Sequence, residues 1–289
     1  MEKQTDTLSI AMIVRNEEEM VEDALKSVQG ADELVVTDTG STDSTLDIVK
    51  RYTSNISHFK WCDDFSAAKN YALSKCTKSW VMFIDADCRL RSSVSDIRKA
   101  IANAKHDTVQ VRLYAVNATH LLPKIFRRVP AHYFIGANQE YLAGVTQTDP
   151  SDIQIEYLSS PNHRIDPLRN MRILQKAVAK NPALTREKFY LAREFFYHRQ
   201  YADAILWLND YLQHGRVYAE IVEAMYLKAQ CLWYSGKGTD ARDACLKCIQ
   251  WNPDCKKALL LMSQMHAEPW KSHWRKIAMQ ATNANVMFT

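Results

Sequence analysis

Two acidic residues, Asp85 and Asp87, stand one residue apart at the end of an apolar run over residues 80–84. A run of this length between polar residues predicts a strand that is buried on both faces of a largely parallel sheet. Ligands of such sheets bind at the carboxyl ends of the strands. Two carboxylates at that place raise each other's pKa unless a positive charge lies between them. We therefore predict a divalent metal ion with oxygen ligands, Mg²⁺ or Mn²⁺, together with a diphosphate; an exposed acidic turn is the alternative.

The segments around this run predict the sheet that would carry it. Strands are expected over residues 8–14, 33–37, 56–60 and 80–84, alternating with helices over residues 18–28, 42–52 and 65–74. This order implies a doubly wound, mostly parallel sheet with right-handed crossovers. Ser41 or Thr42 is the expected cap of the second helix, and Asp63 or Asp64 that of the third. Strand-like pieces over residues 109–114, 124–126 and 153–158 would extend the sheet.

From about Arg169 onward the pattern becomes continuously helical. Residues 189–204 are echoed by residues 224–241, and a degraded third unit starts at Ala258. Helix-turn-helix units at this period resemble tetratricopeptide repeats. We therefore expect an α/β domain over residues 1–168 and an all-α domain over residues 169–289, which would cap the first domain or hold two subunits together as a homodimer.

Composition sets broad limits on the function. The 289 residues are 47% hydrophobic and can bury a full core, and only 7 glycines and 8 prolines argue against an all-β fold dense in turns. The formal charge of +4 permits an anionic partner but does not demand one. We expect no transmembrane segment and no secretory signal. With seven cysteines that are most simply reduced thiols, a cytoplasmic protein is expected.

Polar residues also follow the first two predicted strands. Asp38 ends the second strand, and Gly40 permits a tight turn before a helix whose first N–H groups are free. We predict that Asp38 accepts a hydrogen bond from a nucleotide, although it could cap the turn only. Val14 and Arg15 end the first strand, where an arginine can face a base or a phosphate.

Four motifs in this order resemble those of the family 2 glycosyltransferases of the GT-A fold. They occupy residues 12–17, 38–43, 64–70 and 85–87. The resemblance is closest to the branch with C-terminal tetratricopeptide-like repeats, which includes lipo-oligosaccharide core glucosyltransferases and bacteriocin S-glycosyltransferases. It implies a GT-A domain and the inverting transfer of a hexose from a UDP-sugar, with Mn²⁺ or Mg²⁺.

The resemblance also implies roles for particular residues. The nucleotide-sugar would be bound by Val14, Arg15, Asp38, Asp64, Asn70, Asp85 and Ala86. Asp87 and His163 would ligate the metal, and Glu140 would be the general base. Gln139 replaces the histidine that usually precedes this glutamate. The basic residues Lys124, Arg127, Arg128 and Arg164 would contact the acceptor or a phosphate.

The resulting hypothesis is a metal-dependent hexosyltransferase whose acceptor is open. A saccharide, a peptide side chain and a modified DNA base are the three candidates for the acceptor hydroxyl or thiol. DNA is favoured by the basic runs over residues 124–128 and 164–172. A catalytically inactive scaffold that binds a protein partner through its repeats is the alternative from another class.

Overall fold

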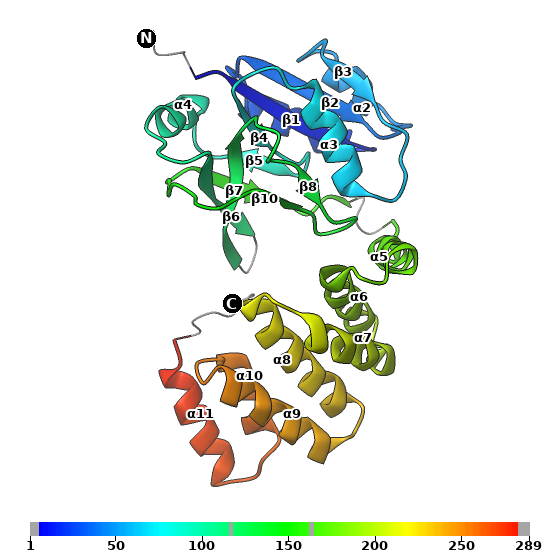
Figure 1. The fold of residues 1–289 in the computed structure, drawn as a ribbon, viewed down its shortest axis with the longest axis vertical. Coiled ribbons are helices and arrows are strands. Elements are labelled where there is room, and N and C mark those ends of the chain that lie inside the picture. The colour runs from blue at the N-terminus through cyan, green and yellow to red at the C-terminus, as the bar shows by residue number, and fades with distance from the viewer. Residues whose placement is uncertain (1–5, 116–117, 162–164, 283–289) are drawn as a thin grey trace. The chain divides into compact units, whose positions relative to one another are not determined.

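The computed structural model describes residues 6–115, 118–161 and 165–282. The chain divides into two compact units, Met1–Pro167 and Leu168–Thr289, which are described separately here (Figure 1). None of the helices in the described ranges combines the length and the hydropathy that crossing a membrane requires.

The first unit is built on one large sheet. Among the described residues it contains eight strands in the order β3-β2-β1-β4-β7-β6-β10-β5. Its strands are β1 (Leu8–Val14), β2 (Glu33–Asp38), β3 (Ile56–His58), β4 (Trp80–Phe83), β5 (Cys88–Leu90), β6 (Thr108–Ala115), β7 (Ala118–Arg127) and β10 (Gln154–Tyr157). The strands β3, β2, β1 and β4 are mutually parallel, whereas β7 runs antiparallel to β4. The predicted α/β architecture is confirmed.

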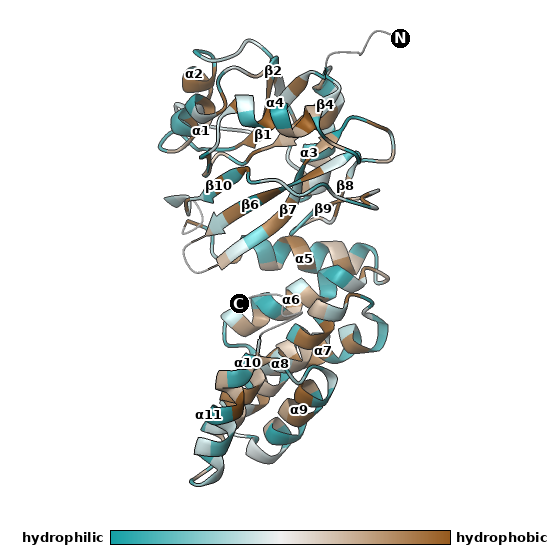
Figure 2. Cartoon of the chain, turned by 90° about the vertical axis from the view of Figure 1, so that its left-hand side faces the viewer, coloured by the Kyte–Doolittle hydropathy of each residue, from teal (hydrophilic) through white to brown (hydrophobic). Residues whose placement is uncertain are grey.

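Helices cover both faces of this sheet. The face formed by Leu8, Ile10 and Met12 packs against α1 (Val21–Ser27) and α4 (Val94–Ala102). The opposite face packs against α3 (Phe65–Lys75) and against a small hairpin of β8 (Phe134–Ile135) and β9 (Tyr141–Leu142). Figure 2 shows the hydrophobic colouring of β1 inside this sandwich. Burial on both faces explains the apolar runs of the central strands.

The helix α2 (Thr45–Val49) is shorter than the sequence predicts, and Ser44 is its N-cap residue instead of Ser41 or Thr42. Around the start of α2, side-chain oxygens accept hydrogen bonds from backbone N–H groups that would have no partner in the first turn of a longer helix. Asn16 Oδ1 accepts from Thr42 N at 2.7 Å, and Asp43 Oδ1 accepts from Thr45 N at 3.0 Å. Such local bonds favour a loop over a helical turn.

A β-bulge interrupts the pairing of β6 with β7. Val109 pairs with Ile125 but Val111 pairs with Leu122, so Pro123 and Lys124 together oppose Gln110. A bulge re-aims the side chain of the extra residue, and it accommodates a proline, which has no N–H to donate to the ladder. Lys124 therefore owes its direction to this irregularity.

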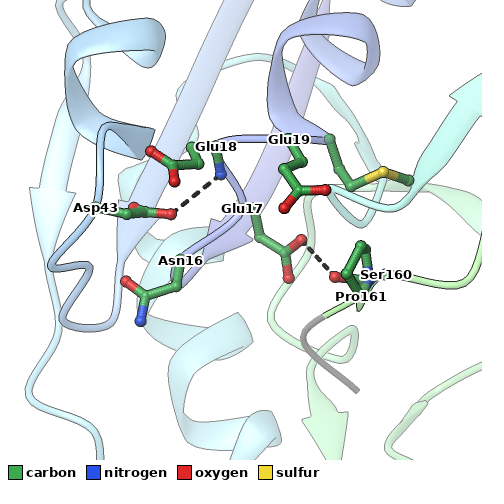
Figure 3. A pocket seen from close by; sticks show the side chains of 8 residues that line it. Asn16, Glu17, Glu18, Glu19, Asp43, Ser160 and Pro161 are labelled. Atoms are coloured by element: carbon green, nitrogen blue, oxygen red, sulfur yellow. Dashed lines mark hydrogen bonds between the residues drawn. The ribbon is translucent and has the colours of Figure 1, made fainter. Parts of the chain in front are cut away.

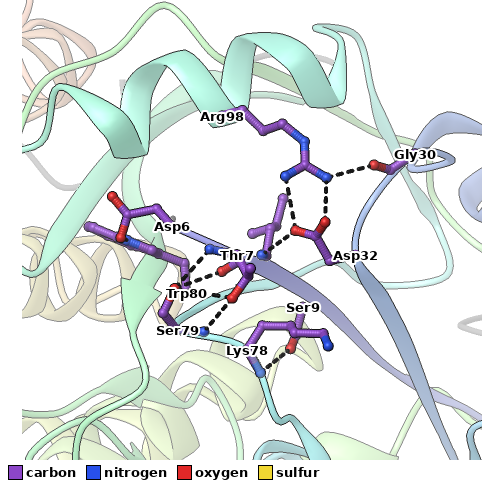
Figure 4. Close-up of polar contacts among 10 residues, drawn as sticks. Asp6, Thr7, Ser9, Gly30, Asp32, Lys78, Ser79, Trp80 and Arg98 are labelled. Carbon is purple, nitrogen blue, oxygen red and sulfur yellow. Dashed lines mark hydrogen bonds and ion pairs between the residues drawn. The ribbon is translucent and has the colours of Figure 1, made fainter. Parts of the chain in front are cut away.

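Polar contacts join the segments at the amino ends of β1 and β4 (Figure 4). Arg98 of α4 donates to both carboxylate oxygens of Asp32, each at 2.9 Å, and Asp32 Oδ2 also accepts from Leu8 N at 2.8 Å. Trp80 Nε1 donates to Asp6 Oδ1 at 3.0 Å. These bonds fix the amino ends of the central strands and leave the carboxyl ends for the site.

The second unit is helical throughout its regular elements. Its helices are α5 (Arg169–Lys180), α6 (Thr185–Tyr197), α7 (Tyr201–His214), α8 (Tyr218–Tyr234), α9 (Gly238–Trp251), α10 (Lys256–Gln264) and α11 (Trp270–Gln280). Helix α6 packs with α7, α8 with α9, and α10 with α11. The third pair is more complete than the degraded unit that the sequence predicts, because α11 supplies its second helix.

Candidate active site

The loops that follow β1 and β2 are joined into one assembly. Val14 O accepts from Thr39 N at 2.9 Å, and Asn16 N donates to Ser41 Oγ at 3.1 Å. Asn16 has a φ of 54°, a left-handed conformation that asparagine adopts more readily than most residues. Arg15 is exposed next to this turn. The first two strand ends, predicted to face a nucleotide, thus meet at one place.

Asp38 lies at the centre of this assembly and is 4% exposed. Its Oδ2 accepts from Gly40 N at 3.1 Å and its Oδ1 from Ser41 N at 3.0 Å. Burial alone would raise the pKa of Asp38, but hydrogen bonds from Ser41, Gly40 and His58 outweigh it and hold that pKa below the usual value. Asp38 is therefore ionised, and the hydrogen bonds that it accepts from Gly40 and Ser41 stabilise its own turn.

A small acidic pocket, with a volume of about 50 Å³, lies beside these loops (Figure 3). It is lined by Asn16, Glu17, Glu18, Glu19, Met20, Asp43, Ser160 and Pro161. Glu17 points toward Ser160, whose Oγ donates to Glu17 Oε2 at 2.9 Å, and Glu18 N donates to Asp43 Oδ2 at 3.2 Å. A wall of carboxylates attracts cations and repels a bare diphosphate.

Asp85 lies just beyond the end of β4 and is held by two lysines. Lys69 Nζ lies 3.1 Å from Asp85 Oδ1, and Lys124 Nζ lies 3.0 Å from Asp85 Oδ2. Burial would raise the pKa of Asp85, but the charges of Lys124 and Lys69 keep it far below its usual range. Two ammonium groups therefore compensate the charge of Asp85, and the predicted metal ion would be held by Asp87.

Glu140, the predicted general base, belongs to the same cluster. Its Oε1 lies 2.5 Å from Lys69 Nζ, and its side chain is 14% exposed. It follows Gln139, which has a φ of 55°, and immediately precedes β9. The structure therefore brings Asp85, Glu140 and Lys124 together, and it adds Lys69, which the sequence analysis did not include among the site residues.

Two residues of α3 were predicted to support the nucleotide, and the structure gives both of them local roles. Asp64 is the N-cap residue of α3, as predicted, and its Oδ1 accepts from Ala67 N at 2.9 Å. Asn70 binds Phe134 with both ends of its amide, through Nδ2 to the carbonyl at 2.9 Å and through Oδ1 to the N–H at 2.7 Å. Asn70 therefore anchors β8, and its amide groups are engaged there.

Asp87, the predicted metal ligand, lies buried close to other carboxylates. It is 7% exposed, and burial together with the charges of Asp85 and Glu17 raises the pKa of Asp87 to about 7. No cluster of three or more acidic, histidine or cysteine side chains that could hold a metal occurs in the part of the chain that the structure describes. One or two carboxylates with substrate phosphates and water are nevertheless the usual shell of Mg²⁺. His163, the other predicted ligand, and Arg164 lie outside the described residues.

The turn that carries Ala86 and Asp87 is secured by Arg89, another residue that sequence reasoning missed. Arg89 is 8% exposed, and its Nη1 donates to the carbonyls of Ala86 at 2.9 Å and Cys88 at 2.8 Å. Its Nη2 donates to Met20 O at 2.6 Å. A single side chain therefore ties this turn to the loop after β1.

The predicted basic cluster of Lys124, Arg127 and Arg128 does not exist as a cluster. Because β7 is antiparallel to β4, Arg127 pairs with Trp80 at the amino end of β4. Its guanidinium bonds to Asp6 and Asp107, and Arg128 donates to the carbonyl of Lys78 at 3.1 Å. Both arginines lie near the amino end of β4 and away from Asp85, so the structure does not gather them with Lys124, and their contact with the acceptor or a phosphate stays a prediction.

Parts of the chain are similar to known proteins. A model of glycosyl transferase family 2 matches residues 9–148. A TPR repeat-containing protein of Synechococcus elongatus is 44% identical over 28% of this chain, and the SPbeta prophage-derived glycosyltransferase SunS of Bacillus subtilis is 40% identical over 29% of it. Each alignment covers only 20% of the relative's own length.

Among solved structures, that of TarS from S. aureus covers 81% of this chain and 54% of its own, with 16% identity and a TM-score of 0.49. The family assignment depends on the model match alone: residues 9–148, all within the first unit, match glycosyl transferase family 2.

Proposed function

We propose that the chain transfers a hexose from a UDP-sugar, with inversion at the anomeric carbon, to a hydroxyl or thiol of an acceptor. The observation that carries this proposal is the joining of Asp85 and Glu140 by one buried ammonium group at the carboxyl end of β4. This contact supports the proposal, because the residue proposed as the base and the residue proposed to face the donor share one partner, within the region that matches glycosyl transferase family 2.

In the proposed reaction, Glu140 takes the proton of the acceptor hydroxyl or thiol as that atom attacks the anomeric carbon. The bond between the anomeric carbon and the UDP oxygen breaks at the same time, and UDP leaves with both electrons. Val14, Arg15 and Asp38 would surround the uridine, and Asp85 and Ala86 would face the ribose or the sugar. Asp87 would hold Mn²⁺ or Mg²⁺, which when bound supplies positive charge to the departing diphosphate.

The acceptor is proposed to be a saccharide or a peptide side chain. The DNA alternative depended on two basic runs, residues 124–128 and 164–172, of which the structure describes the first in full. Lys124 is bound to Asp85, and Arg127 is bound to acids at the opposite edge of the sheet. A phosphate backbone needs basic side chains gathered on one surface, so this run no longer supports a nucleic acid.

A donor hydrolysis assay tests the proposal. The full-length protein with Mn²⁺ is incubated with a panel of UDP-sugars, and released UDP is measured. We expect release from at least one donor, and a loss of about 100-fold or more in Asp87→Asn, because charge stabilisation of a leaving group is of that size. Asp152→Asn is the matched control, since its side chain is fully exposed.

Two results would count against the proposal in different ways. No UDP release from any donor would remove the UDP-sugar assignment. Equal turnover in Asp87→Asn and Asp152→Asn would remove the metal site and leave the donor class intact. Mass spectrometry of glycan and peptide mixtures after reaction with the active donor would then identify the acceptor class.

A further inference from the structure

Lys69 is a buried lysine that contacts two carboxylates from distant parts of the chain. The residue is 7% exposed, and its Nζ lies 3.1 Å from Asp85 and 2.5 Å from Glu140. The aromatic rings of Phe83 and Phe134 flank it, with centroids 5.7 Å and 5.6 Å from Nζ. An ammonium group removed from water in this way depends on its acidic partners and ring faces.

The segment that carries Glu140 is attached to α3 at three points. Phe65 N donates to Ala137 O at 2.9 Å, Asn70 binds the backbone of Phe134, and Lys69 binds Glu140 itself. The first two bonds fix the path of the backbone, whereas only the third reaches the carboxylate.

We propose that Lys69 is a positioning residue that sets the place of the Glu140 carboxylate relative to Asp85. The inference rests on the proposed function, in which Glu140 meets the acceptor and Asp85 faces the donor. Because Lys69 Nζ contacts both carboxylates, it keeps Glu140 on the acceptor side close to Asp85 on the donor side. Small errors in such placement are costly to turnover.

The surroundings of Lys69 argue against a direct role at a phosphate. The ammonium group of Lys69 contacts two carboxylates, and two aromatic rings flank it. Burial alone would lower the pKa of Lys69, but the charges of Asp85 and Glu140 raise it above its usual value. The group therefore stays charged, as an ion-pair bridge requires.

Thermal unfolding of full-length variants tests the contact without any activity. Lys69→Met leaves Glu140 without this partner, and we expect the midpoint of the first unit's transition to fall by on the order of 10 °C. Adding Glu140→Gln removes the unpaired charge and should restore about half of that loss. Strictly additive shifts in the cycle would show that the two side chains do not interact and would overturn the inference.

Turnover then tests the positioning role. With the active donor, Lys69→Met should lose about 10- to 100-fold in kcat, a loss of the size expected when a supporting partner is removed, while UDP affinity by calorimetry stays within about threefold. Lys69→Arg, which keeps the charge, should recover part of kcat. Lys75→Met is the control, because Lys75 lies on the same helix and is exposed.

The possible outcomes distinguish failure of the positioning role of Lys69 from failure of the proposed function. A parallel loss of UDP affinity and turnover in Lys69→Met would make Lys69 a donor-binding residue and overturn the positioning role. Unchanged kcat in a folded Lys69→Met would overturn it as well. If the wild type releases no UDP, the proposed function fails, and the unfolding cycle still decides whether the bridge exists.

Discussion

Asn70 holds the backbone of Phe134 at both its N–H and its carbonyl, with distances of 2.7 Å and 2.9 Å. Asn70→Asp keeps the acceptor but loses the donor, so the Phe134 carbonyl is left facing a carboxylate. We expect a loss of about 1–3 kcal/mol in the free energy of unfolding of the first unit. Urea unfolding of the two proteins measures it.

The same variant separates two roles for Asn70. If the residue anchors β8 only, UDP affinity by calorimetry is unchanged in Asn70→Asp while turnover falls with the misplacement of Glu140. A large loss of UDP affinity would instead support the nucleotide contact that the sequence analysis predicts.

Arg89 offers a second prediction, because its guanidinium satisfies the carbonyls of Ala86, Cys88 and Met20. Arg89→Met leaves these buried acceptors without that donor, and we expect a loss of about 3 kcal/mol in unfolding free energy. Arg91→Met is the control. The Arg91 side chain is 58% exposed, and its ion pair with Glu156 is of the surface kind that contributes little. Equal losses in both variants would contradict the prediction.

Lys124 and Arg128 are close in the sequence, but we expect only the substitution of Lys124 to lower donor turnover. Lys124→Met removes one of the two cations on Asp85 and should lower donor turnover by about 10-fold or more, since charge placement at a reacting centre has effects of this order. Arg128→Met removes contacts to the carbonyls of Lys78 and Thr77 and should leave turnover unchanged. A loss in Arg128→Met as large as that in Lys124→Met would restore the basic cluster that the structure divides.

The lowered pKa of Asp38 predicts that the stability of the first unit depends on pH. Its folded-state pKa is held below the ordinary value of 3.8, so its stabilising effect is complete above pH 3.8 and is lost as the pH falls through the folded pKa. At neutral pH the wild type should be more stable than Asp38→Asn by on the order of 1.5 kcal/mol. Urea unfolding at a series of lower pH values should show this gap narrowing below pH 3.8. A gap that stays constant with pH would show that the charge of Asp38 has no part in it.

The sequence was sufficient for the features that depend on neighbours along the chain. The apolar run before Asp85 predicts a buried strand, and Asp64 followed by small residues predicts a capped helix; both are present. The alternation of strand and helix patterns also predicts that β1 to β4 are parallel, whereas their order in the sheet, β3-β2-β1-β4, was not predicted.

The features that the sequence did not reveal depend on partners from separate segments. The sequence places Lys69 in the motif over residues 64–70, near a nucleotide, but its contact with Glu140 is visible only once the hairpin that carries Glu140 is packed against α3. The run from Lys124 to Arg128 reads as one patch, because the antiparallel pairing that separates its ends cannot be deduced from composition. Asn16 in a left-handed turn likewise stops the second helix from starting at Thr42.

The extra residue where Pro123 and Lys124 oppose Gln110 has a consequence for how this protein could diversify. Beyond that point β6 and β7 stay paired as far as Ala115 and Ala118, with the alternation of side chains between the two faces shifted by one residue, and β10 pairs with the other side of β6. Whole residue pairs could be gained or lost in this part of β6 and β7 without turning Lys124 to the other face, because the bulge separates the two registers. Variation in the length of these strands would therefore leave the contact between Lys124 and Asp85 in place.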